Sequence, residues 1–412
     1  MEKVIADIHG NQLGSALVRL WVMAGIYANR NLTLNLWEHK AGKAQRESRS
    51  KVLRQDLKNG NAISLDQAKQ DPLALVLALD RFLADEMRVD RPLSSVPHVI
   101  DGAEYWLVRH PLARRRQASQ VDQPNNRTAW FRAHSVIPAQ VGEAHAPLLV
   151  TVLEPDLATA KALNAILAAA SIRIFVAHFN DGVCLQGVSN QAEKRFFTGF
   201  DEPSTRSQSI RATLERARQE NADVVVFPEL TVTPEQRDEI AAWQRGAKKI
   251  GSAPTLIVSG SFHEQIEGRK VNRAELLGLS RTLLVHEKIR PFGHAEGFAE
   301  DFETGNRLEL LATSLGLIAM PICKDFNDIV DGPPWPRIAP DWCLVPSMGD
   351  AGNVNAHAKR AKELRDVFAR TVSAVANQEL DQAETKAPGF CHDAARTNIA
   401  PGGACIEIQL NP

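Results

Sequence analysis

The 412-residue sequence predicts a layered α/β fold in its second part, preceded by a separate mixed α/β region. The chain is long enough for two domains with sizeable cores. Near residue 170 the pattern changes, and short apolar runs begin to alternate with helical stretches and hairpin-like pairs. Such alternation is typical of layered α/β domains. We therefore divide the chain into residues 1–168, of unknown role, and residues 169–412.

The first region is predicted to mix helices with a few strands. A strand-turn-helix unit is expected in "VIADIHGNQLGSALVRLWVMAG" and a strand in "LTLNLWEHK". Two helices are expected in "KAQRESRSKVLRQDL" and "LDQAKQDPLALVLALDRFLADEM", the second opening on Ser64 as its N-cap. The region ends with a strand, "PLLVTVLEP", and an alanine-rich helix, "DLATAKALNAILAAAS".

The second region begins with "IRIFVAHFN", a nearly continuous apolar run typical of a strand buried on both faces. Its helical stretches are "SQSIRATLERARQENA" and "HAKRAKELRDVFARTVSAVANQ". Its further apolar strands are "DVVVFPEL", "TLIVSGSF", "AELLGLS", "RTLLVHEK", "LGLIAMPIC" and "DWCLVPS".

Composition restricts the classes of partner. The net charge is −1, so the sequence offers no overall attraction for nucleic acid or an anionic membrane. The arginines at 114–116 lie in a polar stretch and are expected to be a solvated face. The five cysteines form no C-x-x-C pair, which suits a reducing compartment. No apolar run is long enough to span a bilayer, so we expect a cytoplasmic protein.

The stretch "DIHGN" at residues 7–11 resembles the start of a two-metal phosphoesterase, with Asp7 and His9 as ligands. Two metal ions need several more ligands, including a bridging carboxylate. The sequence contains no Asn-His and no His-x-His, and its one Gly-Asp pair is far downstream, at residues 349–350. We therefore interpret Asp7, Gly10 and Asn11 as a strand-to-helix turn, and expect neither metal nor cofactor.

Three chemically capable side chains follow three separate apolar strands. Glu229 follows "DVVVFP", Lys288 follows "RTLLVHE", and Cys323 follows "LGLIAMPI". Each alone is ordinary, but layered α/β folds gather their sites at strand ends. Together they supply a nucleophile, a base for its proton and a cation for a developing oxyanion.

The ordered trio "FPEL", "HEKIRPF" and "PICKDF" resembles the nitrilase superfamily of carbon–nitrogen hydrolases over about residues 170–412. Flanking matches include "VNRAELL", "VPS" at 345–347 and "ANQ" at 376–378. The resemblance implies a four-layer αββα sandwich. It also implies Glu229 as base, Lys288 as oxyanion support, Cys323 as nucleophile and the Lys324 amide in an oxyanion hole.

A fourth catalytic residue is expected in the loop "KIRPFGHAEGFAEDFETG". A buried lysine facing a thiolate and a glutamate needs a further acid to hold it or to guide water. Glu296 is our first choice, since "AEGF" resembles a Glu-Gly-aromatic step of the amidase branch, and Glu300 is the second. Loop acids exposed to solvent are the alternative.

The sequence thus predicts thiol-dependent hydrolysis of a small-molecule amide or nitrile through an acyl-enzyme. A different interpretation makes the hydrolase-like domain one module of a larger regulatory or defence assembly, with residues 1–168 as its sensor or docking part. We expect a homo-oligomer, or a partner protein bound through the N-terminal domain.

Overall fold

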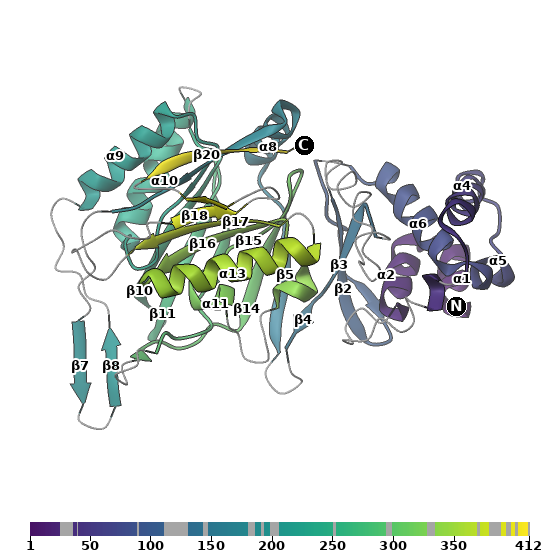
Figure 1. Cartoon of the computed structure of the whole chain (residues 1–412), viewed down its shortest axis with the longest axis horizontal. Helices are drawn as coiled ribbons and strands as arrows, with labels where there is room; N and C mark the ends of the chain where they lie inside the picture. Colours follow the sequence, from purple (N-terminus) through teal and green to yellow (C-terminus); the bar gives the residue numbers. More distant parts are fainter. Residues whose placement is uncertain are drawn as a thin grey trace. The chain divides into compact units, whose positions relative to one another are not determined.

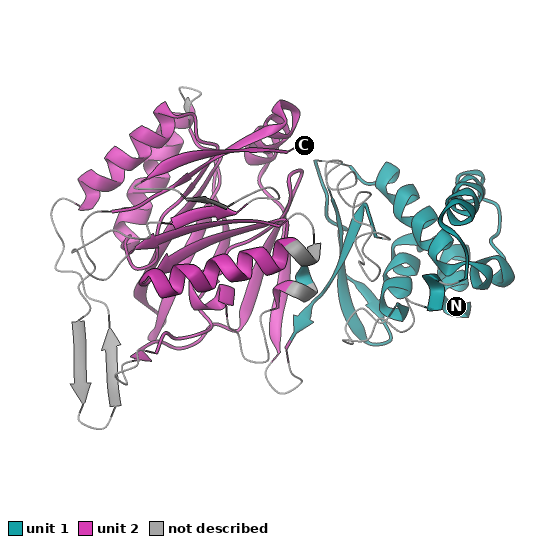
Figure 2. Ribbon diagram, viewed as in Figure 1, with its two compact units in different colours: residues 1–141, 337–339, 367–369 teal, residues 142–336, 340–366, 370–412 magenta. Residues whose placement is uncertain are grey.

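The computed structural model describes most of the chain (Figure 1). The described residues are 1–24, 36–38, 40–88, 90–110, 131–142, 147–179, 186–190, 193–197, 206–249, 253–293, 299–327, 334–368, 371–378, 389–392, 397–399 and 403–410. The chain forms two compact units (Figure 2). Unit 1 contains residues 1–141, 337–339 and 367–369, and unit 2 contains the remainder. No helix in the described parts is long and apolar enough to cross a bilayer.

Unit 1 combines helices with a small antiparallel sheet. Its helices are α1 (Glu2–His9), α2 (Leu13–Met23), α4 (Lys43–Asn59), α5 (Leu65–Gln70) and α6 (Pro72–Glu86). Its three-stranded sheet has the order β1 (His98–Ile100), β2 (Ala103–Arg109), β3 (His134–Pro138). The central helix is α6, which buries every residue from Pro72 to Asp80.

Two predictions for unit 1 were wrong. The expected strand before "DIHGN" is helix α1, because Val4, Ile5 and Ile8 share one helical face and are buried in the unit's core. The expected helix over 65–87 is two helices. Asp71 ends α5 and caps α6, where its carboxylate accepts the Ala74 N–H at 3.2 Å and Pro72 is the first residue.

Other predictions for this region were confirmed. Helix α4 matches the helix expected over residues 43–57, and Ser64 caps α5 in a reciprocal capping box with Gln67. The strand expected in "LTLNLWEHK" lies mostly outside the described residues, and residues 36–38 are helical.

Unit 2 contains two large sheets, and its core lies between them. The first has the order β12 (Thr282–Glu287), β11 (Arg269–Leu277), β10 (Leu256–Ile266), β9 (Val224–Val226), β6 (Ser171–Val176), β20 (Ala404–Gln409). Within unit 2, the second has the order β19 (Thr397–Ile399), β18 (Gly389–His392), β17 (Val372–Gln378), β16 (Trp342–Met348), β15 (Gly316–Ala319), β14 (Arg307–Thr313), β5 (Leu148–Leu153). A small sheet joins β13 (Ala299–Glu300), β8 (Glu193–Phe197) and β7 (Gln186–Asn190).

The two large sheets pack face to face, with helices on both outer faces. Alternate residues such as Val176 and Val224 meet Leu344 of the second sheet in one apolar cluster. On the other face of the first sheet, apolar residues of α9 (Arg206–Gln219) and α10 (Pro234–Lys249) pack on the strands. Helix α13 (Ala351–Phe368) lies across the second sheet (Figure 1).

The structure moves the expected boundary between the two regions. Residues 142–168, which we had assigned to the first region, belong to unit 2. Strand β5 pairs in parallel with β14, and Leu163 and Ile166 of α8 (Leu157–Ala169) enter the core between the sheets. A further prediction was wrong, because the helix expected over 357–378 ends at Phe368. Its last part is strand β17, buried at every position between β16 and β18.

Candidate active site

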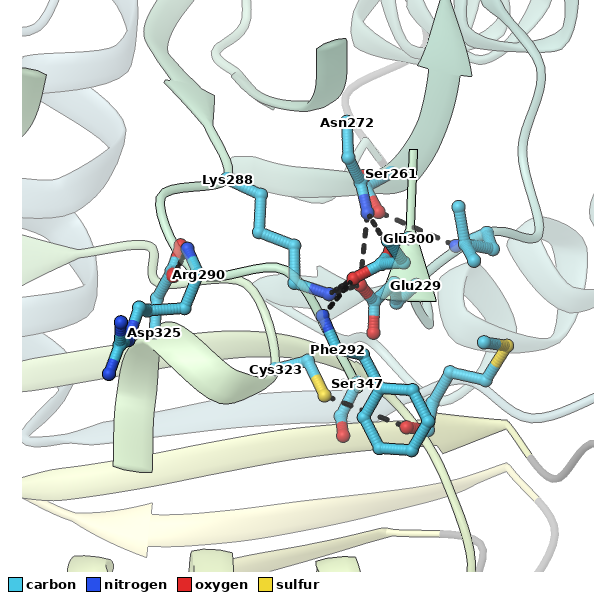
Figure 3. Close-up of polar contacts among 12 residues, drawn as sticks. Glu229, Ser261, Asn272, Lys288, Arg290, Phe292, Glu300, Cys323, Asp325 and Ser347 are labelled. Atoms are coloured by element: carbon cyan, nitrogen blue, oxygen red, sulfur yellow. Dashed lines mark hydrogen bonds and ion pairs between the residues drawn. The ribbon is translucent and has the colours of Figure 1, made fainter. Parts of the chain in front are cut away.

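Glu229, Lys288 and Cys323 each follow a strand that delivers them into the interior of unit 2. Glu229 comes shortly after β9, Lys288 directly after β12, and Cys323 between β15 and α11 (Lys324–Asn327). Each of the three residues is only 1% exposed. Figure 3 shows their side chains gathered in one cluster. The expectation that the three strand ends meet therefore describes the observed geometry.

Successive residues of β16 hold both the cysteine and the glutamate. The Cys323 N–H donates to the Pro346 carbonyl at 2.8 Å, and the Glu229 N–H donates to the Ser347 carbonyl at 3.2 Å. The Cys323 thiol lies 3.5 Å from the Met348 carbonyl oxygen. The "VPS" stretch thus fixes the main chain at two of the three predicted site residues.

The main chain is strained at Cys323 and directly after Glu229. Cys323 has φ 45°, and Leu230, directly after Glu229, has φ 54°. Residues other than glycine rarely adopt this left-handed conformation, which costs about 1–3 kcal/mol and is typical of functional sites. At Cys323 the turn presents the sulfur at the start of α11.

Lys288 lies between two buried carboxylates. Its Nζ donates to Glu229 Oε1 at 2.7 Å and to Glu300 Oε2 at 2.5 Å. Asn272 Nδ2 bridges the same carboxylates, at 3.0 Å from Glu229 Oε1 and 3.2 Å from Glu300 Oε1. The ammonium and the amide therefore fix the two acids relative to each other (Figure 3).

Glu300, our second choice for the fourth site residue, is the acid that contacts Lys288. Its Oε2 also accepts the Phe292 N–H at 2.6 Å, and its Oε1 lies 3.2 Å from His263 Nε2. Glu296, our first choice, lies outside the described residues. The expected role of Glu296 stays a prediction.

The environment drives the pKa values of the two acids apart. Burial raises the pKa of Glu229 well above its usual value, and the neighbouring Cys323 adds to this against the pull of Lys288. Burial also opposes ionisation of Glu300, but Lys288 and His263 outweigh it and lower the pKa to about 2. For Lys288, the surrounding anions outweigh burial and raise the pKa. One acid is thus suited to take up a proton, and the other to remain charged.

Asp325 is a structural residue of the site that our sequence analysis did not single out. Its carboxylate accepts the main-chain N–H groups of Ile289 at 3.0 Å and Arg290 at 2.7 Å, and lies 2.8 Å from His286 Nε2. It therefore ties the loop after Lys288 to the turn after Cys323. The signal was present, since the "PICKDF" stretch places this acid two residues after the cysteine.

The "DIHGN" stretch lies in unit 1, and the side chains of Asp7 and His9 have protein partners. Asp7 pairs with Arg19 at 2.9 Å, and His9 Nε2 lies 3.2 Å from the Ile63 carbonyl oxygen. Gly10 and Asn11 form the turn between two helices rather than a strand-to-helix turn. Within the described ranges, no group of three or more His, Cys, Asp or Glu residues is arranged to hold a metal ion.

Comparison with known proteins gives matches to solved structures alone. No family model and no curated protein matches the chain. An amidase from Nesterenkonia sp. matches with a TM-score of 0.42 and 18% identity, over 58% of this chain and 91% of that chain. A variant of the Nesterenkonia AN1 amidase, described as from the nitrilase superfamily, matches with a TM-score of 0.42 and 18% identity, over 58% and 90%.

A third match is a variant of the same amidase after Michael addition of acrylamide at its active-site cysteine. Its TM-score is 0.42 at 15% identity, over 58% of this chain and 92% of that chain. At these identities and scores, the roles of the residues in this chain depend on its own geometry.

Proposed function

We propose that this chain hydrolyses a carbon–nitrogen bond of a small amide-like or nitrile substrate through a Cys323 acyl-enzyme. One observation carries the proposal. A cysteine, a glutamate of raised pKa and a lysine held by two acids converge, almost fully buried, from three strand ends. This set contains a nucleophile, a proton acceptor and a fixed cation, as acyl transfer requires.

For an amide, the course begins when Cys323 Sγ attacks the carbonyl carbon and its proton passes to Glu229. Collapse of the tetrahedral adduct breaks the C–N bond, and Glu229 returns the proton to the leaving nitrogen. Glu229 then takes a proton from water as the water attacks the thioester. Collapse releases the acid and regenerates the Cys323 thiol.

Lys288 and Glu300 have a constant charge during this course. Since Glu300 has a pKa of about 2, it stays ionised, and Lys288 stays protonated beside it. The ammonium supports the oxyanion, together with the Lys324 amide that the sequence resemblance implies. We further propose that unit 2 is a four-layer αββα sandwich of the nitrilase type, supported by the helix layers outside its paired sheets.

The test is a panel of small aliphatic amides and nitriles, incubated with the full chain at neutral pH. We expect ammonia release and, for a reactive amide analogue, a mass increase on the Cys323 peptide. Cys323→Ala should remove both signals, whereas Cys405→Ala should keep them, because Cys405 lies in β20 and packs with the apolar cluster under α9 and α10. Substrate turnover by Cys323→Ala at the wild-type rate would refute the proposal.

A further inference from the structure

A series of hydrogen-bonded polar side chains begins at Cys323. Asn353 Nδ2, near the start of α13, lies 3.6 Å from Cys323 Sγ and 3.1 Å from Ser347 Oγ. Ser347 Oγ lies 2.8 Å from His357 Nε2. Ser347 and His357 are fully buried, and Asn353 is partly buried. The course above uses none of these three side chains.

We propose that Asn353 donates a hydrogen bond that stabilises the Cys323 thiolate, and that Ser347 and His357 orient its amide. This proposal rests on the proposed function only in taking Cys323 as the nucleophile. The proposed acceptor of the Asn353 hydrogen bond is the Cys323 sulfur, which belongs to the protein itself. The proposal therefore does not depend on the class of substrate.

The number of hydrogens on each group fixes which group donates and which accepts in this series of hydrogen bonds. An asparagine Nδ2 only donates, so Ser347 Oγ accepts from Asn353. The single Ser347 hydrogen then needs an acceptor, and His357 Nε2 is within reach. Burial lowers the pKa of His357 to about 4, so the ring is neutral near pH 7 and can accept at Nε2.

The position of Asn353 matters most when the thiol loses its proton. In the thiol form, Cys323 donates to the Met348 carbonyl, and ionisation removes that bond. Asn353 Nδ2 carries two hydrogens and has three acceptors within reach: Ser347 Oγ, the Met348 carbonyl at 3.2 Å, and the sulfur. Among the described residues, it is the side-chain donor within hydrogen-bond distance of Sγ. A donor to an anion is stronger than a donor to a neutral group, so its second hydrogen favours the thiolate.

The charged and titratable groups around the sulfur come from several elements. Glu229 after β9 and Lys288 after β12 interact electrostatically with Cys323, and Glu300 of β13 is bound to Lys288. Asp350 is exposed and accepts the Asn353 main-chain N–H at 2.9 Å, and His357 is neutral. The acids disfavour a thiolate and Lys288 favours it, so a neutral donor can shift this balance.

The experiment measures alkylation of Cys323 by iodoacetamide in the full chain between pH 5 and pH 10, followed on the Cys323 peptide by mass spectrometry. In alkylation, the sulfur displaces iodide from carbon and the thiol proton is released, so the rate reports the thiolate fraction. Asn353→Ala should move the midpoint of the pH–rate profile upward by about one pH unit, and slow alkylation about tenfold below the midpoint.

Two further variants sharpen the test. Asn353→Asp is nearly isosteric and should raise the midpoint further, because an anion replaces the donor. An acidic residue also stabilises the first turn of a helix, so Asn353→Asp should fold. It provides the test of the proposal in case Asn353→Ala does not fold. Ser347→Ala should raise the midpoint less than Asn353→Ala, since it removes the acceptor that orients the amide. Asn355→Ala, an exposed neighbour on α13, should leave the profile unchanged.

An unchanged midpoint in folded Asn353→Ala or Asn353→Asp would overturn the proposal, and an unchanged midpoint in Ser347→Ala would overturn the orienting role of Ser347. The assay needs no substrate, so it separates this proposal from the proposed function. A chain that hydrolyses none of the panel but shows the shift would refute the hydrolysis and keep the thiolate donor. A chain that hydrolyses a panel substrate but shows no shift of the midpoint would keep the hydrolysis and refute the thiolate donor.

Discussion

Replacing Glu300 with glutamine removes a charge at a position where four donors converge. Oε2 accepts from Lys288 Nζ and the Phe292 N–H, and Oε1 from Asn272 Nδ2 and His263 Nε2. The glutamine amide has one oxygen, so its NH₂ group must face one of these donor pairs. Flipping Asn272 to present its Oδ1 would turn that oxygen toward Glu229 as well. The variant therefore cannot satisfy the site by small adjustments.

The size of the loss follows from the pKa of Glu300. A value of about 2, against 4.5 for a free glutamate, corresponds to roughly 3 kcal/mol of stabilisation at neutral pH. Because the pKa is lower in the folded state, this stabilisation is present above pH 4.5 and declines as the pH falls toward 2. Glu229 remains as a partner of Lys288, so we expect a loss near the lower end of the ~3–5 kcal/mol for a broken buried ion pair.

Urea unfolding of wild type and Glu300→Gln at pH 7 and pH 3 measures this loss. The difference in unfolding free energy should be about 3 kcal/mol at pH 7, and less than half of that should remain at pH 3. Glu303→Gln is the matched control, since Glu303 is an exposed acid of the same segment and should cost at most ~0.5 kcal/mol. Equal stability of wild type and Glu300→Gln at pH 7, or a difference of the same size at pH 3, would refute the reasoning.

Four more predictions concern the same site and the extent of unit 2. On an amide that the panel identifies, Glu300→Gln should lose ~10²-fold or more in turnover, and a comparable loss in Glu296→Gln alone would transfer the role to Glu296. EDTA should leave hydrolysis unchanged, and inactivation that added Mn²⁺ reverses would restore Asp7 and His9 as candidate ligands. A fragment of residues 142–412 should fold and be alkylated at Cys323, whereas a fragment starting at residue 170 lacks β5 and α8 and should be unstable in the same thermal melt. Hydrolysis should rise with pH through the raised pKa of Glu229, since the base must be ionised, and a profile without that limb in wild type would remove Glu229 as the base.

The sequence predicts where the three strand-end residues lie because each follows a short apolar run. "DVVVF" and "LLVHE" are short, mostly apolar runs, which favours buried strands, and the chain then leaves the sheet near Glu229 and Lys288. The side chains that hold the site together carry no such local signal. Asn272 lies in the middle of β11, and Asn353 in a polar helix turn, so only the tertiary structure brings them to the glutamate and the sulfur.

The incorrect elements also have physical reasons. "VIADI" has a length and an apolar content that fit either a strand or a short helix. Packing of its apolar residues within the core of unit 1 stabilises the helix. The stretch before Gln378 is rich in alanine and valine, so it continues the pattern of α13 in sequence. Its burial on both faces between β16 and β18 makes it a strand instead.

The second acid explains how a buried lysine can accompany a basic glutamate. With Glu229 as its single partner, Lys288 would form a closed ion pair, which lowers the pKa of the acid and weakens it as a base. Glu300 also pairs with Lys288, as its pKa of about 2 indicates, while burial and the neighbouring Cys323 raise the pKa of Glu229. A proton can then pass between Cys323 and Glu229 without changing the total charge of the buried site. The free energy required to remove that charge from water is therefore supplied when the protein folds. No step of the proposed course adds a further net charge to the buried site.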